Sequence, residues 1–398
     1  MDFYEESLER HRVLRGKIEI HSRMRLESQH DLSLAYTPGV ARPCEVIARD
    51  PSAAWDLTWK GRCVAVVSDG TAVLGLGDIG PEAALPVMEG KAALFREFGG
   101  LDAIPLVLAT KDVDEIVSIV RAVAPTFGGI NLEDISAPRC FKIERALQDV
   151  GIPVLHDDQH GTAIVLLAAV MNAVRVLKTT LGKLRVVMVG AGAAGRAIAR
   201  LLLCEEQDER CIPVGDLVIC DSKGIIYPGR EGNDEVKEEM ARLSNPDGRK
   251  GDLRDALKGA DVFIGVSRGG LLTAADIESM GPNPIVFAMA NPEPEIMPDE
   301  ARRGGAAIVG TGRSDFPNQV NNVLAFPGLF RGALEARATR FTNAMLYAAI
   351  DAIADSVVDP APNRILPPAF DRSVAVRVAD AVAKAARASG VCFERPDA

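Results

Sequence analysis

The stretch Leu184-Arg185-Val186-Val187-Met188-Val189-Gly190-Ala191-Gly192-Ala193-Ala194-Gly195 decides the fold. Its first six residues predict a buried strand, and the glycines that follow open a helix that is expected to run through Leu203. A Gly-x-Gly-x-x-Gly sequence between a strand and a helix is the fingerprint of a dinucleotide-binding βαβ unit. The helix amino end favours negative charge, so we expect a pyrophosphate to bind at this turn. The expected cofactor-binding residues here are Gly190, Ala191, Gly192, Ala193, Ala194 and Gly195.

Apolar strands on both sides of this turn extend the same pattern. They are expected at 63–68, 105–109, 152–155, 184–189, 217–220, 262–266, 284–289 and 306–309. Strands that alternate with helical segments predict an α/β fold with a Rossmann-type doubly wound parallel sheet. We place a smaller α/β N-terminal domain with a helical arm at 1–160, which carries substrate and catalytic residues. The dinucleotide-binding domain with C-terminal helices is expected at 161–398.

Composition restricts the class of partner. The 398 residues are 47% hydrophobic, which fits a globular protein with full cores. The 45 Lys and Arg against 55 Asp and Glu give a net charge of -10. This charge disfavours binding to nucleic acid or to an anionic membrane, so a small molecule is the expected partner.

The cysteines and apolar runs predict a cytoplasmic protein. Seven cysteines occur without a Cys-x-x-Cys pair, so they are expected to be reduced thiols. The first 20 residues lack the apolar centre of a signal peptide. The longest apolar run begins at Thr162 and is broken by Asn172 and Arg175 before it reaches the roughly 20 residues of a membrane span.

Two pairs of acids follow apolar segments, and one of these segments is the strand expected at 152–155. Asp157 and Asp158 lie in His-Asp-Asp-Gln-His-Gly-Thr at 156–162, before an apolar helix expected at 163–177. Capping a helix needs only one short polar side chain, so one of these acids is surplus. Glu133 and Asp134 form the second pair, although Asp134 alone would read as a turn or helix cap. Together the four acids would repel one another without a cation, and oxygen ligands favour Mg²⁺ or Mn²⁺.

A lysine stands inside the apolar stripe of the helix expected at 82–98. Lys91 shares this stripe with Met88 and Phe95 at helical spacing, so it faces the core or a cavity. A desolvated ammonium has a lowered pKa and would serve as a general base or hold a carboxylate. The alternative is a lysine that reaches water past Ala84 or Ala92, and the pattern alone leaves both readings open.

Further polar residues stand at strand ends and turns. Asp221 follows the strand at 217–220, where a carboxylate accepts from ribose hydroxyls and favours NAD, although Lys223 could instead meet the 2′-phosphate of NADP. Asn291 precedes a proline and is by default a turn residue. Tyr36 stands beside a Pro-Gly bend, where a loop anchor is the favoured reading of that stretch alone.

Six collinear segments carry a resemblance to a known family. The chain resembles the malic enzymes, in particular the short bacterial type, in LSLAYTPGV at 32–40, VSDGTAVLGLGD at 67–78, PVMEGK at 86–91, NLEDI at 131–135, HDDQHGT at 156–162 and NNVLAFPG at 321–328. One departure lies after Asp69-Gly70, where the larger eukaryotic members carry an arginine for a substrate carboxylate and this chain has Ala72.

The resemblance implies an activity and assigns roles. The reaction is oxidative decarboxylation of L-malate to pyruvate and CO₂, with NAD or NADP and a divalent metal, in a homodimer. Lys91 is implied as general base and Tyr36 as general acid. The metal ligands are Glu133, Asp134 and Asp158, Asn291 binds the cofactor, and Asn321 and Asp157 lie near the substrate.

Two alternatives share these motifs. A malolactic-type enzyme would use the same metal, cofactor and acids but would release lactate. A catalytically idle NAD-binding regulatory protein would leave a buried lysine and the acid set without a purpose. Analysis of the product formed from malate separates the three.

Overall fold

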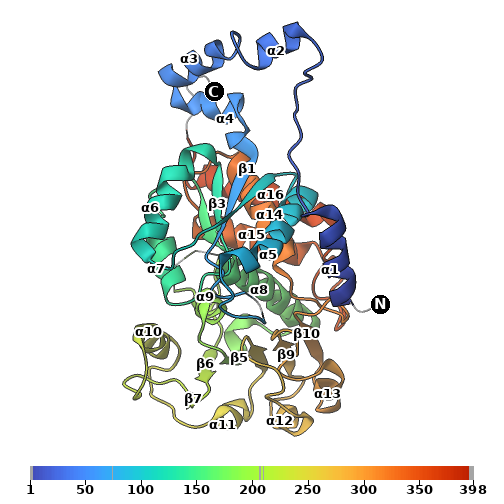
Figure 1. The fold of residues 1–398 in the computed structure, drawn as a ribbon. Helices are drawn as coiled ribbons and strands as arrows, with labels where there is room; N and C mark the ends of the chain where they lie inside the picture. The colour runs from blue at the N-terminus through green and yellow to red at the C-terminus, as the bar shows by residue number, and fades with distance from the viewer. Residues whose placement is uncertain (1–2, 74, 206–207, 209, 394–398) are drawn as a thin grey trace.

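Two mainly parallel sheets form the framework of the protein (Figure 1). The structure is a computed structural model that describes residues 3–73, 75–205, 208 and 210–393. The first sheet has the order β2-β1-β3-β4, and the second has the order β10-β9-β8-β5-β6-β7, in which only β7 is antiparallel. The strands are β1 (Cys63–Ser68), β2 (Asp102–Val107), β3 (Gly129–Leu132), β4 (Val154–His156), β5 (Arg185–Val189), β6 (Asp216–Asp221), β7 (Gly224–Ile225), β8 (Val262–Gly265), β9 (Ile285–Ala288) and β10 (Ile308–Thr311).

Helices cover these sheets and extend the chain at its amino end. The arm and first sheet carry α1 (Phe3–Leu14), α2 (Gln29–Ala35), α3 (Ala41–Arg49), α4 (Ala54–Leu57), α5 (Pro81–Leu94), the π-helical η3 (Phe95–Gly99), α6 (Val113–Val123) and α7 (Arg139–Ala146). The rest of the chain forms α8 (Asp157–Leu177), α9 (Ala193–Leu202), α10 (Glu235–Ser244), α11 (Leu253–Leu257), α12 (Ala274–Glu278), α13 (Pro298–Arg303), α14 (Phe326–Glu335), α15 (Asn343–Asp355) and α16 (Arg372–Ala388). The predicted α/β fold with a doubly wound sheet is confirmed.

The second sheet reverses its winding at β5. From β5 the chain passes to β6 on one side and then returns to β8 on the other. Strands of such sheets are buried on both faces, which explains why β8 and β9 are continuous apolar runs with every residue buried. Ligands bind beyond the carboxyl ends of the strands at this reversal, which is where the glycine turn after β5 lies.

The central helix α8 begins earlier than predicted. It starts at Asp157, so Asp157 and Asp158 occupy its first turn instead of the loop before it. Acidic side chains are stabilised there by the positive end of the helix dipole. The 21-residue helix is long and apolar enough to cross a membrane, contrary to the prediction from the broken apolar run. However, 61% of its apolar stretch is buried inside the protein, which identifies it as a core helix.

The C-terminal helices pack on the first sheet's half of the molecule. Helix α14 contacts η3, and α16 contacts both. The rings of Phe95 and Phe330 lie 5.4 Å apart, and Phe330 also meets Phe341 at 5.2 Å, both edge to face. This aromatic cluster joins segments more than 200 residues apart in sequence.

One cysteine prediction is wrong. Cys204 and Cys211 form a disulfide that closes a short loop after α9, whereas all seven cysteines were expected to be reduced. Sequence spacing could not reveal this pair, because the two residues are not in a recognised motif and meet only through the turn between α9 and β6. Cys44, Cys63, Cys140, Cys220 and Cys392 are free thiols, as predicted.

The aromatic cluster makes a quantitative prediction. Replacing the fully buried Phe330 by alanine removes its ring from between two others and leaves a cavity, which should cost about 3–5 kcal/mol of unfolding free energy. Phe370→Ala is the matched control, because Phe370 is 85% exposed and should change stability by no more than about 0.5 kcal/mol. Urea unfolding followed by circular dichroism measures both. Equal midpoints for the two variants would contradict the assignment.

Candidate active site

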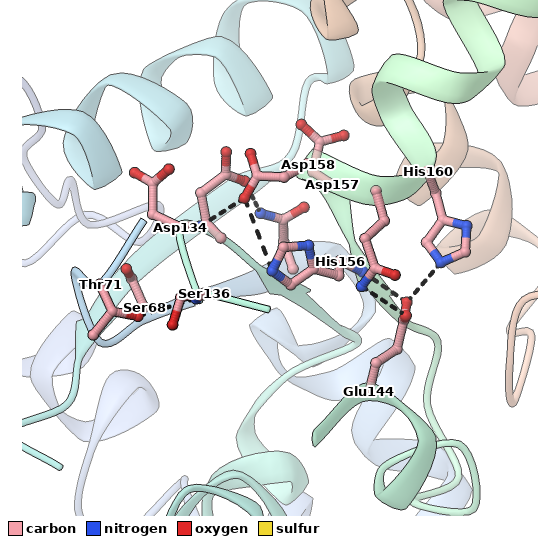
Figure 2. A network of polar contacts seen from close by, with 12 residues as sticks. Ser68, Thr71, Asp134, Ser136, Glu144, His156, Asp157, Asp158 and His160 are labelled. Carbon is pink, nitrogen blue, oxygen red and sulfur yellow. Dashed lines mark hydrogen bonds and ion pairs between the residues drawn. The ribbon is translucent and has the colours of Figure 1, made fainter. Parts of the chain in front are cut away.

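Acids from two neighbouring strands meet at one edge of the first sheet. Strands β3 and β4 are parallel, with Leu132 paired to His156, so the residues that follow each strand emerge side by side. Glu133 and Asp134 come after β3, and Asp157 and Asp158 come after β4. The structure therefore gathers the four predicted acids into one site, and Figure 2 shows Asp134, Asp157 and Asp158 of this set.

Lys91 lies among these acids. Its side chain is only 7% exposed, and its Nζ lies 2.6 Å from Asp157 Oδ2 and 2.9 Å from Glu133 Oε1. The ammonium also stands 4.2 Å from the centre of the Phe326 ring, an attractive cation–π contact. Lys91 is thus buried, as its position in the apolar stripe of the helix predicted. The alternative, in which its side chain reaches water, is excluded.

The predicted direction of the Lys91 pKa is wrong in this arrangement. Burial by itself lowers the pKa, but Asp157 and Glu133 outweigh it and raise the pKa of Lys91 above its ordinary value. The helical stripe showed that Lys91 is buried, but it carried no information on carboxylates supplied by other elements.

Three carboxylates beside Lys91 fit a metal ion. Oxygens of Glu133, Asp134 and Asp158 all lie within 4.8 Å of one another. Asp134 adopts the left-handed conformation with φ of +53°, which is uncommon for a residue other than glycine, and its buried Oδ2 has no hydrogen-bond partner among the described residues. Burial and mutual repulsion raise the pKa of Asp134 to about 8 and that of Asp158 to about 6.

These residues would suit a hard divalent cation. Clustered, desolvated carboxylates with an unpartnered oxygen lower their free energy by sharing a cation, and oxygen ligands select Mg²⁺ or Mn²⁺. When bound, such an ion supplies polarisation of a substrate carbonyl oxygen.

Asp157 has different partners from the other acids. It is fully buried, and its Oδ2 accepts hydrogen bonds from Lys91 and from the side-chain amide of Asn322. Asp157 therefore orients Lys91 from behind. Sequence reasoning missed Asn322 because it selected the adjacent Asn321, whose Oδ1 instead accepts from the backbone N–H of Val323.

A polar network behind Asp158 braces the first turn of α8 (Figure 2). Glu144 of α7 accepts from the backbone N–H of His156 and lies 2.9 Å from His160 Nε2. Gln159 donates to the second oxygen of Glu144. One carboxylate thus holds three residues of the motif, through the side chains of Gln159 and His160 and the backbone of His156, whose ring lies 3.8 Å from Asp158.

The remaining predicted residues lie farther from Lys91. Tyr36 is 68% exposed at the end of α2, and Figure 1 shows α2 at the far end of the arm, well away from α8. Asn291 follows β9, and a Cβ at Gly75 would lie 3.9 Å from its backbone oxygen. The loop that contains Asn291 therefore abuts the glycine-rich loop of the first half.

The glycine turn has the shape a pyrophosphate needs. Gly190 has φ of +117°, and a Cβ there would lie 2.5 Å from the carbonyl oxygen of Val266. A Cβ at Gly195 would lie 2.1 Å from the Gly190 oxygen, so only glycine allows the helix to pack this closely. Within the described chain a Cβ at Gly192 would meet nothing within 4 Å, which leaves the backbone open to a ligand. The three glycines thus fit a dinucleotide.

The carboxylate of Asp221 is paired with two positively charged side chains. Its carboxylate pairs with Arg230 at 2.5 Å and with Lys237 at 2.9 Å, neither of which the sequence reasoning named. The two partners lie 9 and 16 residues beyond Asp221, in the β7–α10 loop and on α10, so no local motif announces them.

An arginine contacts Thr71, the residue before Ala72. Arg139 of α7 donates to Asp69, Thr71 and Ser136 and to the Lys111 carbonyl. Both terminal nitrogens are engaged, so Arg139 braces this loop.

Comparison with known proteins identifies the family. The family model "Malic enzyme, NAD binding domain" matches residues 159–387, and "Malic enzyme, N-terminal domain" matches 15–112 and 108–148. The chain belongs to the malic enzyme family. Its family is therefore the one that the six sequence segments indicated.

Close relatives cover nearly the whole chain. The bifunctional malic/malolactic enzyme of Bacillus subtilis is 55% identical over 98% of this chain and 95% of its own length. The NAD-dependent malic enzyme of Geobacillus stearothermophilus is 52% identical, over 94% and 78%. The crystal structure of the NAD-dependent malic enzyme of Thermotoga maritima superposes with a TM-score of 0.90 at 48% identity, over 96% of this chain and 99% of that one. The NADP-dependent malic enzymes of Escherichia coli and Halomonas elongata are 47% and 46% identical over 94% of this chain, which covers 51% of the first and 91% of the second.

The acid set predicts a metal-dependent gain in stability. Mn²⁺ at about 100 times its Kd should stabilise the folded protein by about 2.7 kcal/mol, and EDTA should reverse the rise in melting temperature. Asp134→Asn should lose this rise while keeping the fold of the metal-free protein, because it removes a repelled charge. Asp299→Asn is the control, since Asp299 is 89% exposed on α13. An undiminished Mn²⁺ effect in Asp134→Asn would rule out this metal site.

Proposed function

We propose that this malic enzyme converts L-malate to pyruvate and CO₂ with reduction of NAD or NADP, with Lys91 and Tyr36 as its acid–base groups. The observation that carries the proposal is Lys91, buried 2.9 Å from Glu133 of the three-acid set and 2.6 Å from Asp157. The candidate metal ligands would bind a cation, and that cation would hold the substrate hydroxyl. A buried amine beside these ligands is suited to taking the proton of that hydroxyl.

The proton at the C2 hydroxyl of malate goes to Lys91 Nζ in this proposal. Asp157, fixed by Asn322, and Glu133 hold the amine in place for that transfer. The charge of Asp157 and then that of Glu133 raise the pKa of Lys91, and a cation shared by Glu133 would weaken the second of these attractions and so lower the pKa of Lys91 from its metal-free value. A bound nicotinamide would accept the hydride from C2. After loss of CO₂, C3 needs a proton.

Tyr36 supplies that C3 proton from a second copy of the chain. Within its own subunit Tyr36 is exposed. It lies on an arm in which helices α1, α2 and α3 have no buried residues. More than half of the exposed large apolar side chains of the described chain lie within its first 57 residues, among them Phe3, Ile20 and Leu34. Such an extended apolar surface marks a protein contact, and a homodimer in which each arm reaches the neighbouring site would cover it.

We also infer that the enzyme acts in the cytoplasm on dissolved substrate. The net charge of -10 and the burial of α8 within the core support this placement. No contact with nucleic acid or membrane is required by the proposed reaction.

A steady-state assay tests the activity. Malate with Mn²⁺ should yield pyruvate and reduced NAD or NADP, and EDTA should abolish the reaction. Lactate is the second candidate product, because the Bacillus subtilis relative is a bifunctional malic/malolactic enzyme. Lys91→Ala should abolish malate oxidation, and Tyr36→Phe should chiefly impair decarboxylation and ketonisation. Full activity in both variants, or binding of NAD without turnover, would overturn the proposed function.

Mixing two inactive variants tests the shared site. If Tyr36 acts in the neighbour, a heterodimer of Lys91→Ala and Tyr36→Phe has one site with both groups intact. Random exchange of subunits should then restore about a quarter of the wild-type rate. If both groups act within one chain, each heterodimer site lacks one of them and the mixture stays inactive. Mixing Lys91→Ala with itself is the control for subunit exchange.

A further inference from the structure

A buried carboxylate that the proposed reaction does not use lies between β9 and α13. Glu295 is 0% exposed. Its Oε1 accepts from the backbone N–H of Ser267 at 2.9 Å, and its Oε2 accepts from the backbone N–H of Ala290 at 3.0 Å. Burial raises the pKa of Glu295, and hydrogen bonds from backbone N–H groups oppose that effect. The side chain of Glu295 therefore serves the main chain of two other segments.

The two N–H groups belong to loops that begin at the ends of neighbouring strands. Gly265 and Ala288 are paired at the carboxyl ends of the parallel strands β8 and β9. Ser267 lies two residues beyond the end of β8, and Ala290 lies two residues beyond the end of β9. One carboxylate of Glu295 thus bridges two loops that emerge side by side from the sheet.

Gly265 makes room for this carboxylate. A Cβ at Gly265 would lie 2.3 Å from the carboxyl carbon of Glu295 and 2.6 Å from each of its oxygens. A side chain at the end of β8 would therefore displace the carboxylate. The backbone oxygen of Glu295 accepts from the N–H groups of Leu271 and Leu272 at 2.8 Å and 3.0 Å. The side chain and the main chain of one residue thus hold the β8 loop at both of its ends.

The two loops reach toward opposite parts of the candidate site. The β8 loop adjoins the glycine turn, since a Cβ at Gly190 would lie 2.5 Å from the backbone oxygen of Val266. The β9 loop carries Asn291, whose backbone oxygen would lie 3.9 Å from a Cβ at Gly75 in the other half of the molecule. Glu295 therefore fixes the main chain between the pyrophosphate turn and the half that carries the acid set.

These loops lie where the second nucleotide of a dinucleotide is expected. The sheet reverses at β5, with β6 on one side and β8 and β9 on the other. A dinucleotide binds across such a reversal, with one nucleotide over each half of the sheet. The adenosine half is expected toward β6, so the nicotinamide half is expected beside the loops after β8 and β9.

We propose that Glu295 is a positioning residue for the coenzyme, because its carboxylate fixes the loops after β8 and β9 as the wall of the nicotinamide site. The inference rests on the proposed dinucleotide-linked function and adds a residue to it. Glu295 acts through the main chain of Ser267 and Ala290. An amide in place of the carboxylate would turn one acceptor oxygen into a donor that faces an N–H, so one of the two loops would lose its anchor.

Binding of reduced coenzyme tests the proposal without turnover. Titration calorimetry follows whichever of NADH and NADPH binds the wild-type protein more tightly, and also the matching adenosine fragment, ADP or 2′,5′-ADP, without malate or metal. Glu295→Gln should weaken binding of the coenzyme by about tenfold and that of the fragment by less than about twofold, because the fragment lacks the nicotinamide. The matched control is Glu278→Gln, which replaces an exposed acid of α12 and should change neither affinity.

A purely structural role for Glu295 gives a different result. Glu295→Gln would then lower the melting temperature, and it would weaken coenzyme and fragment equally or leave both unchanged. Either of these binding results would overturn the proposal. Gly265→Ala displaces the same carboxylate without removing it and should show the same selective loss, so an equal loss of both ligands there would also overturn it.

Failure of the proposed function has its own signature. Wild-type protein that binds neither NADH nor NADPH would overturn the dinucleotide-linked function together with the role of Glu295. Wild-type protein that binds coenzyme, with no selective loss in Glu295→Gln, would overturn only the role of Glu295.

Discussion

The contact on which the site depends is a buried ammonium held between two carboxylates. Lys91 comes from α5, Glu133 follows β3 and Asp157 opens α8, so one ion cluster fixes three elements relative to one another. Removing one member of such a cluster leaves an uncompensated buried charge, which typically costs 3–5 kcal/mol. The cluster lies where β3 and β4 end and α8 begins, and Asn322 joins it through its hydrogen bond to Asp157.

The carboxylates of this cluster outnumber its one lysine. Four carboxylates share one lysine, and burial together with the neighbouring carboxylates raises the pKa values of all four. Asp134 also adopts an uncommon backbone conformation there. Such departures from ordinary preference concentrate at functional sites, where binding of a ligand compensates for them.

Local patterns in the sequence predicted some features well. The glycine turn, eight of the ten strands of the two sheets and the burial of Lys91 each depend on a pattern within one segment, and each is present, whereas β3 and β7 were not predicted. What could not be predicted depends on pairs that are distant in sequence. The pKa direction of Lys91, the clamp of Arg230 on Asp221 and the Asn322 contact all require the tertiary arrangement. The disulfide and the early start of α8 were missed because no local signal marks them.

The packing of α14 and α16 against η3 also has a consequence for biosynthesis. The first sheet is synthesised before the helices α14 and α16 that pack on its half of the molecule. Phe95 has no aromatic packing partners until Phe326 and Phe330 have been translated. Domains usually fold as units in the order in which they are synthesised. Here the amino-terminal half would emerge with an exposed apolar face, and closing it requires contacts of very large sequence separation, which slow folding. A nascent chain truncated before α14 should therefore depend on chaperones although it contains both of the strands that carry the acids.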